Sequence, residues 1–147
     1  WSSDVCSSDL MATYTKIAGA IPFKDGVINA GSDQWAFALT NTTPSGTTFT
    51  AGTSDLATGG GYTQGGTNVT TTSFTESAGT AKLILAAPST WTASSSGFTF
   101  RYVILVDKTT NTQIAYWDNG SSIVMNGANA DTFVFTPDAV NGVFTET

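Results

Sequence analysis

A ten-residue segment in the second half of the chain constrains the fold most strongly. Residues 98–107 read Phe-Thr-Phe-Arg-Tyr-Val-Ile-Leu-Val-Asp, an alternating and then mostly apolar run that contains neither Gly nor Pro. Aromatic and β-branched residues favour strands, and a run bounded by turn residues favours one that is largely buried. A second run, residues 112–118, follows the polar sequence Lys-Thr-Thr-Asn. The two segments predict an antiparallel hairpin at the centre of a sheet.

Short strand-like segments separated by Gly, Asn, Asp, Ser and Thr fill the rest of the chain. Alternation is clean in residues 34–40, which predicts a half-buried strand with Trp35, Phe37 and Leu39 on one face. Further strands are expected at residues 14–21, 68–74, 81–87, 90–92, 122–125, 132–136 and 142–145. No helix of ten or more residues is indicated. About 8–10 short strands predict an all-β fold, a single-domain antiparallel β-sandwich of Ig-like or jelly-roll-like type, with a small barrel as the alternative.

The first ten residues differ in character from the remainder. WSSDVCSSDL contains the one cysteine, Cys6, and ends directly before Met11. It resembles the translation of sequencing-adapter sequence. A signal peptide would need a basic start and an apolar stretch of about 7–15 residues, which this segment lacks. We therefore interpret residues 1–10 as a non-native leader, and residues 11–147 as the single β-sandwich domain.

The charge balance bears on possible partners. The chain has a net charge of −6, and its five basic residues are scattered, so no basic stripe can form. Binding to phosphate backbones relies on clustered Lys and Arg, which makes nucleic acid an unexpected partner. No apolar run approaches the roughly 18 residues of a membrane span. Charged residues make up only 11% of the chain, so its surface is expected to consist of Thr, Ser, Asn and Gly, as in extracellular or virion proteins.

Residues 42–66 form the loosest part of the sequence. Glycines flank a single aromatic residue, Tyr62, on both sides. This pattern favours a tight backbone path with the ring as a peg. A phosphate cradle is the functional alternative, but the segment lacks a GxxxxGK[ST] motif and no helix is expected to follow it.

Three aromatic residues are candidates for ligand binding. Trp91 and Trp117 each border a polar loop, and Tyr62 lies among glycines. If exposed, such rings can stack on sugars, as in many carbohydrate-binding modules. The alternative is that they pack in the core or at the edge of the sandwich, as expected for the aromatic residues at alternating strand positions.

Arg101 is the one arginine, and it lies in the most apolar predicted strand. An unpaired buried charge is costly, so Arg101 should either meet a carboxylate or reach solvent. Hairpin geometry makes Asp107 and Asp118 the nearest candidates for a structural ion pair. Residues 118–122 also carry oxygen ligands suited to Ca²⁺, but they lack the EF-hand spacing and its bidentate Glu, so a turn is the preferred interpretation.

Nothing in the sequence has the pattern of a catalytic site. The chain has no histidine, the usual base of a hydrolytic triad. Its acidic residues are dispersed, and although two of them could meet as a glycosidase pair, their spacing gives no sign of it. We therefore expect no enzymatic activity, no metal and no cofactor.

Several segments in a specific order resemble a family of small all-β virion proteins of tailed phages and prophages. The resemblance covers nearly all of residues 11–147 and rests on residues 14–21, 25–29, 35–40, 61–66, 91–92, 98–105, 114–118 and 142–144. It implies a non-enzymatic structural component of the kind described as head decoration, head fibre or tail protein. The resemblance brings no catalytic residues with it.

The resemblance and the composition lead to one functional expectation and one alternative. The chain is expected to be a phage virion structural protein, a capsid decoration or a tail or fibre component, that contacts capsid or tail subunits, forms homo-oligomers and resides in the virion. The alternative is a carbohydrate-binding β-sandwich module that uses exposed Trp and Tyr side chains.

Overall fold

A computed structural model describes residues 15–17, 27–86 and 89–146 of the chain. Every strand pairing in this part is antiparallel, and the one helical element is a 3₁₀ turn, η2 (Gly127–Asn129). The strands are β1 (Thr15–Lys16), β2 (Trp35–Thr40), β3 (Thr67–Val69), β4 (Thr71–Ser77), β5 (Thr80–Leu85), β6 (Ser89–Thr92), β7 (Phe98–Asp107), β8 (Thr112–Met125), β9 (Thr132–Phe135) and β10 (Phe144–Glu146). Residues 1–10, interpreted above as a leader, lie outside the described residues.

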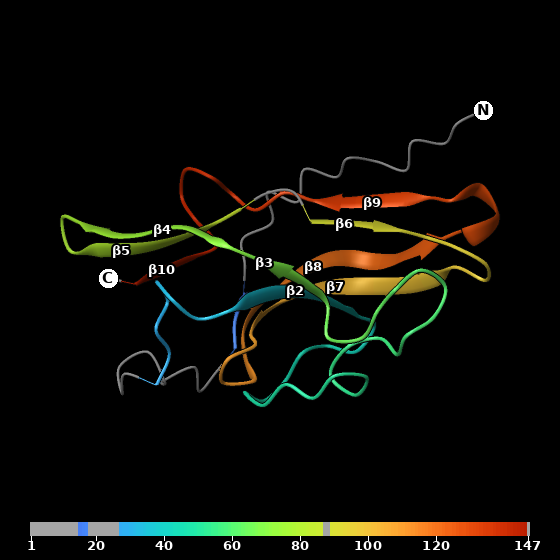
Figure 1. Cartoon of the computed structure of the whole chain (residues 1–147), viewed down its shortest axis with the longest axis horizontal. Coiled ribbons are helices and arrows are strands. Elements are labelled where there is room, and N and C mark those ends of the chain that lie inside the picture. Colours follow the sequence, from blue (N-terminus) through green and yellow to red (C-terminus); the bar gives the residue numbers. More distant parts are fainter. Residues whose placement is uncertain (1–14, 18–26, 87–88, 147) are drawn as a thin grey trace.

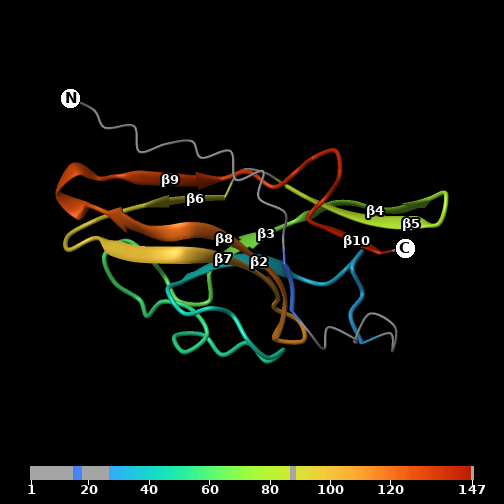
Figure 2. The ribbon, with the colours of Figure 1, turned by 180° about the vertical axis from the view of Figure 1, so that it is seen from behind.

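Two layers of sheet pack face to face, which confirms the predicted β-sandwich (Figures 1 and 2). One layer is a five-stranded sheet in the order β1-β8-β7-β2-β3. The other layer consists of the ribbon β6-β9 and the three-stranded sheet β10-β5-β4, which follow each other end to end along the molecule (Figures 1 and 2). The hairpin of β4 and β5 reaches beyond the end of the five-stranded sheet (Figure 1).

The predicted central hairpin is present as β7 and β8, but β8 is longer than expected. The sequence Asp118-Asn119-Gly120 was expected to form a tight turn between two strands, and this prediction is wrong. β8 continues through it, while the register against β7 changes from Phe100↔Ile123 to Tyr102↔Asp118. The additional β8 residues form a bulge, which the positive φ of Gly120, 80°, permits. A glycine with positive φ is compatible with either a tight turn or a bulge. Here β8 remains paired with β7 on both sides of Gly120, so the segment is a bulge.

The core lies between the two layers. It contains the inward side chains of β2, β7 and β8 together with Phe133 and Phe135 of β9. The ring of Phe37 packs edge-on against Phe135 at 4.8 Å and Trp117 at 5.9 Å between centroids. Edge-to-face contacts of this kind contribute beyond the apolar area that they bury.

The opposite face of the five-stranded sheet is also covered. The loop that follows β2 runs beneath this face (Figure 1), and its Phe49 packs against Ala38, Ile104 and Val106. All six residues of β2 are therefore buried, and the expectation of a half-buried strand is wrong. The large apolar residues of β2 face the core between the layers, and its alanines face the loop. Small side chains on that face let the loop pack closely against the sheet.

The chain changes layers at Thr70, between β3 and β4. β3 pairs with β2 in the five-stranded sheet, whereas β4 pairs with β5 in the other layer. The single strand predicted over residues 68–74 is therefore two short strands in different sheets. Among the described residues, no helix has the length and apolar character needed to span a bilayer.

Candidate functional site

Tyr62 anchors the long loop to the five-stranded sheet. Its side chain is 1% exposed, and its hydroxyl donates to Asp55 Oδ2 at 2.6 Å while accepting from the Leu39 backbone N–H at 3.1 Å. Asp55 also accepts from the backbone N–H groups of Gly52 and Gly65, each at 2.6 Å. Burial, and then the hydrogen bond to Asp55, raises the pKa of Tyr62 well above its usual range. This network holds the loop in one conformation.

The glycines around Tyr62 follow a tight path, as the sequence predicted. A Cβ atom on Gly60 would lie 1.9 Å from the carbonyl oxygen of Gly97, and one on Gly61 would lie 2.2 Å from that of Thr92. Both glycines have positive φ, 60° and 102°. The segment therefore has glycine where its backbone passes close to the backbone of Gly97 and Thr92. The buried ring of Tyr62 fixes the segment in place, as the sequence predicted.

Trp91 and Trp117, the other two candidate binding residues, also lie in the interior. Trp91 is 4% exposed and stacks on Phe133 with 5.7 Å between ring centroids. Trp117 is 6% exposed and packs edge-on against Phe135 at 5.0 Å. Stacking on a sugar requires an exposed ring face, and none of Tyr62, Trp91 and Trp117 presents one in the structure. Their strand positions direct the rings inward even though polar loops adjoin them.

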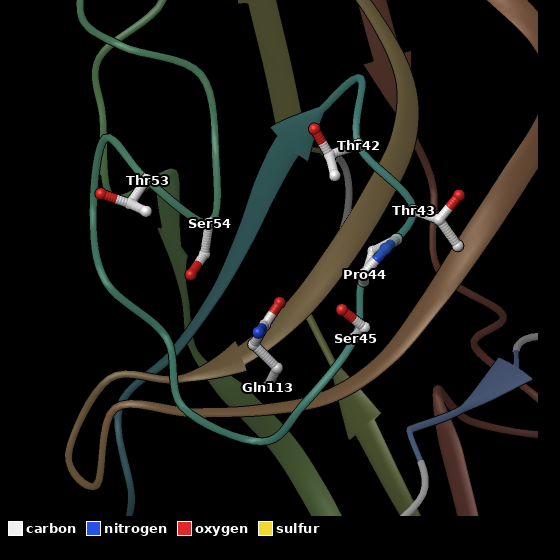
Figure 3. Close-up of a pocket in the computed structure, with 7 residues that line it drawn as sticks. All are labelled: Thr42, Thr43, Pro44, Ser45, Thr53, Ser54 and Gln113. Carbon is white, nitrogen blue, oxygen red and sulfur yellow. The ribbon is translucent and has the colours of Figure 1, made fainter.

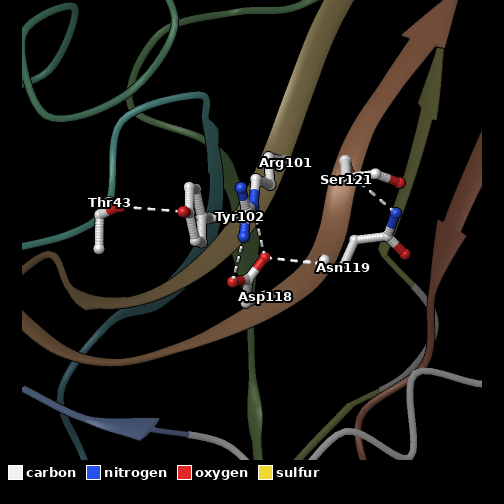
Figure 4. A network of polar contacts seen from close by, with 7 residues as sticks. Thr43, Arg101, Tyr102, Asp118, Asn119 and Ser121 are labelled. Carbon is white, nitrogen blue, oxygen red and sulfur yellow. Dashed lines mark hydrogen bonds and ion pairs between the residues drawn. The ribbon is translucent and has the colours of Figure 1, made fainter.

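Arg101 forms its ion pair with Asp118 across the β7–β8 hairpin (Figure 4). Nε and Nη2 donate to the two carboxylate oxygens at 2.7 and 2.9 Å. The guanidinium, and then the backbone N–H of Gly120, lowers the pKa of Asp118. The hydrogen bond to Asp118 in turn raises the pKa of Arg101. Both side chains are 37% exposed, so this is a surface pair rather than a buried one.

Asp107, the other predicted partner of Arg101, serves a different purpose. It is fully buried at the end of β7, where Oδ1 accepts from the backbone N–H of Thr109 at 2.8 Å. Its Oδ2 accepts from the hydroxyl of Thr110 at 2.6 Å. Asp107 therefore shapes the turn between β7 and β8, and the ion pair involves Asp118 alone.

A polar pocket lies beside this hairpin, beneath the loop that follows β2 (Figure 3). Its volume is about 150 Å³, and its lining residues are Thr42, Thr43, Pro44, Ser45, Thr53, Ser54 and Gln113. The Thr43 hydroxyl is within 2.9 Å of the Tyr102 hydroxyl, and the guanidinium carbon of Arg101 lies 5.1 Å from the Tyr102 ring centroid (Figure 4). The pocket wall is thereby tied to the Arg101–Asp118 pair.

Sequence reasoning missed this pocket because it joins two distant segments. Gln113 is 3% exposed, and it reaches Gly46 and Thr48, more than sixty positions earlier. The one sequence feature that could have indicated the pocket is the polar residue Gln113 directly before the apolar part of a predicted strand. Within the described ranges, no three His, Cys, Asp or Glu side chains are grouped so that they could hold a metal ion.

The outer edge of β4 is a second candidate surface. β4 lies at the edge of its sheet, in the order β10-β5-β4. Phe74, near the middle of β4, is 44% exposed. The hairpin turn consists of Ala78 and Gly79, both with positive φ, which is the geometry of a two-residue loop. This part of the molecule presents backbone hydrogen-bonding groups and an apolar ring to its surroundings.

Comparison with known proteins gives no relative: no family model, curated protein or solved structure matches the chain.

Proposed function

We propose that the protein is a non-enzymatic structural component of a phage virion, a capsid decoration or a tail or fibre protein, that acts through protein–protein contacts. The resemblance of its sequence segments to small tailed-phage virion proteins supports this role. So does the Thr- and Ser-rich composition, in which only 11% of the residues are charged. The structural observation that carries the proposal is the open edge of β4 on the projecting hairpin.

Among the described strands, none pairs with the outer edge of β4, whose backbone groups there form a regular row. Ser77 and Thr80 flank the two-residue turn and form a hydrogen-bonded pair, so the pairs Glu76↔Ala81 and Phe74↔Leu83 are the non-hydrogen-bonded ones. The N–H and C=O groups of Phe74 and Glu76 therefore point away from β5. A strand from a partner can pair with these groups and extend the sheet.

The protection of this edge is limited to the charge of Glu76 and a bulge near the start of β4, between Thr71 and Ser73. Edge strands that must remain unpaired commonly carry Lys or Pro, and β4 has neither. Its residues are Thr, Ser, one Phe and one Glu, most of which favour extended structure. Such an edge is suited to pairing in an assembly, where it is covered by another virion subunit or by a second copy of this chain.

A particle-binding experiment tests the proposal. Labelled protein is mixed with particles of its own phage assembled without it, and the particles are sedimented. We expect the wild-type protein to sediment with the particles. If the protein remains in the supernatant, the proposed virion role is wrong.

Two variants at one position separate the ring of Phe74 from its backbone. Phe74→Thr removes the ring and keeps the outward N–H, whereas Phe74→Pro removes both, at an edge position where proline is tolerated. We expect partial loss of particle binding for Phe74→Thr and complete loss for Phe74→Pro. Val124→Thr, at another exposed apolar site (68% exposed), is the control and should bind normally. Equal binding by all three variants would exclude the β4 edge as the contact.

A carbohydrate-binding module that uses Tyr62, Trp91 and Trp117 lacks structural support. All three rings are buried, so none offers a face to a sugar.

A further inference from the structure

The side-chain amide of Gln113 is fixed in one orientation by the loop above it. Its Nε2 donates to the carbonyl oxygens of Thr48 at 2.9 Å and Gly46 at 3.4 Å. The backbone N–H of Gln113 donates to the carbonyl oxygen of Thr47 at 2.6 Å, which fixes the loop alongside. A carbonyl oxygen can only accept, so the atom that faces Gly46 and Thr48 must be the amide nitrogen. The amide oxygen, Oε1, must therefore point the other way.

Oε1 points into the pocket and lacks a donor. Figure 3 shows this oxygen directed toward the space between Thr42, Pro44 and Ser54. In the part of the chain that the structure describes, no protein group donates to it, although Gln113 is only 3% exposed. Buried polar groups are nearly always paired, and an acceptor left without a donor destabilises the fold. A donor from beyond the described residues is therefore expected at this position.

The pocket walls are neutral and rich in hydroxyl groups. Five of the seven lining residues are Ser or Thr, and none is charged. The Ser54 hydroxyl accepts from the backbone N–H of Thr50 at 3.0 Å, which leaves its own hydrogen free to donate. Pro44 adds a half-buried apolar surface to this wall. The site thus combines a fixed acceptor, several adaptable hydroxyls and one apolar contact.

The size of the pocket limits what can occupy it. The volume of about 150 Å³, comparable with that of an engineered cavity that admits benzene, limits the occupant to a single small ring. The absence of charge in the lining disfavours anions and cations. The chemistry that fits is a neutral ring bearing several hydroxyl groups.

We propose that this pocket binds a single neutral pyranose unit, with one sugar hydroxyl donating to Oε1 of Gln113. The Ser and Thr side chains exchange hydrogen bonds with the remaining hydroxyls, and Pro44 contacts the C–H face of the ring. This site is separate from the buried aromatic residues discussed above, and it does not depend on the proposed virion role. Ordered water is the competing occupant.

Nuclear magnetic resonance titration of the full chain tests the site. The probes are D-glucose, D-galactose, N-acetyl-D-glucosamine and L-rhamnose, with glycerol as an open-chain polyol. At least one pyranose should give saturable shifts of the Gln113 side-chain N–H₂ and of backbone N–H groups in residues 42–54, with a millimolar Kd. If no pyranose saturates, or if glycerol gives the same shifts, the pocket holds only water and the proposal is wrong.

A matched pair of variants identifies the contribution of Oε1. Gln34 bonds in the same manner as Gln113, since its Nε2 donates to the carbonyl oxygens of Trp35 and Val69 at 2.9 and 3.1 Å, but it does not line the pocket. Gln113→Met should raise the Kd roughly fivefold or more, as expected for loss of one hydrogen bond. Gln34→Met should leave the Kd unchanged. Equal effects of the two substitutions would contradict direct contact.

A third variant blocks the pocket and leaves Gln113 in place. Ser45 lines the pocket, and its exposed side chain makes no hydrogen bond to another described residue. Ser45→Trp should fill the entrance and abolish the saturable shifts, while the Gln113 side-chain resonances remain dispersed as in a folded loop. Persistence of sugar binding in this variant would place the sugar elsewhere and overturn the proposal.

Discussion

The hydroxyl of Tyr62 donates to Oδ2 of Asp55 across 2.6 Å, and this buried hydrogen bond joins two turns of the long loop between β2 and β3. The two residues are seven positions apart, and each also binds backbone N–H groups, Tyr62 that of Leu39 and Asp55 those of Gly52 and Gly65. These side-chain hydrogen bonds thus hold together a segment that has almost no regular secondary structure. It also supports the Thr53–Ser54 wall of the polar pocket, which directly precedes Asp55.

Tyr62→Phe is expected to lower the free energy of unfolding by about 1–3 kcal/mol. The substitution keeps the ring but leaves Asp55 and the Leu39 N–H without their partner in a buried site. Urea denaturation measures the loss. Tyr116→Phe, at a half-buried tyrosine whose ring packs edge-on against Tyr102, is the control and should change stability by less than about 0.5 kcal/mol. Equal losses in the two variants would show that the bond to Asp55 contributes nothing.

Alkaline pH is expected to destabilise the protein through Tyr62. Burial, and then the Asp55 hydrogen bond, raises the pKa of Tyr62 in the folded state above its ordinary value of 10.0. Below pH 10.0 the hydroxyl is protonated in both states, so its full contribution to stability is present. Above that pH the unfolded chain loses the proton and the folded chain retains it, so the free energy of unfolding falls by up to about 1.4 kcal/mol per pH unit.

Denaturation midpoints measured on either side of pH 10.0 check this dependence. Other tyrosines also titrate there, so the informative quantity is the difference between the wild-type protein and Tyr62→Phe. That difference should shrink as the pH rises. A difference that stays constant across the range would mean that Tyr62 ionises as readily in the folded protein as in the unfolded chain.

Gly61→Ala should be far more damaging than Gly46→Ala. Both glycines have positive φ, 102° and 75°, so alanine is strained at either site. A Cβ on Gly46 meets nothing within 4 Å, whereas one on Gly61 would lie 2.2 Å from the carbonyl oxygen of Thr92. We expect a loss of about 1–2 kcal/mol for Gly46→Ala and at least twice that for Gly61→Ala, measured by thermal unfolding. Equal losses would show that backbone strain alone matters.

Strand positions were predictable where the sequence pattern is long and uninterrupted. β7 begins at Phe98 and ends at Asp107, as predicted, because its continuous β-branched and aromatic run is compatible with few other structures. The pairing of β7 with β8 followed from the polar turn between them. The layer change at Thr70 was not predictable, because the residues on either side of it read as one strand and only distant partners separate them.

The candidate site was less predictable than the fold. The ion pair between Arg101 and Asp118 was within reach because hairpin geometry places the two residues near each other. The aromatic candidates were misjudged because the polar loops beside them suggested exposure, whereas Tyr62, Trp91 and Trp117 all belong to the core between the two layers. The sequence contains almost no indication of the role of Gln113. Its amide binds the carbonyl groups of Gly46 and Thr48, which lie beside it because Thr48 pairs with Thr112 of β8.

Trp91→Ala is expected to destabilise the fold rather than to remove a binding function. Its ring is 4% exposed and stacks on Phe133, so truncation leaves a cavity in the core between the β6-β9 ribbon and the five-stranded sheet. Buried Trp→Ala substitutions cost about 3–5 kcal/mol, which chemical denaturation will detect. If Trp91→Ala unfolded at the wild-type midpoint, the ring would have to be exposed in solution, and a sugar-stacking role would again be open.

The Arg101–Asp118 pair predicts a specific response to acid. The Arg101 guanidinium, and then the Gly120 N–H, lowers the pKa of Asp118 below its ordinary value of 3.8. The contribution of this carboxylate to stability is therefore fully present above pH 3.8 and is lost as the pH falls through the folded-state value. Both side chains are substantially exposed, so the effect is small and weakens with added salt.

A carboxyl-carbon titration by nuclear magnetic resonance measures the pKa of Asp118 directly. In Arg101→Met, which keeps much of the side-chain stem over Tyr102 but removes the charge, the pKa of Asp118 should rise toward 3.8. It should stay somewhat below that value, because Gly120 still donates to Oδ1 at 2.7 Å. Asp138, whose pKa is lowered mainly by hydrogen bonds from Asn141, is the internal control and should titrate alike in both proteins. An unchanged pKa of Asp118 in Arg101→Met would show that the ion pair does not persist in solution.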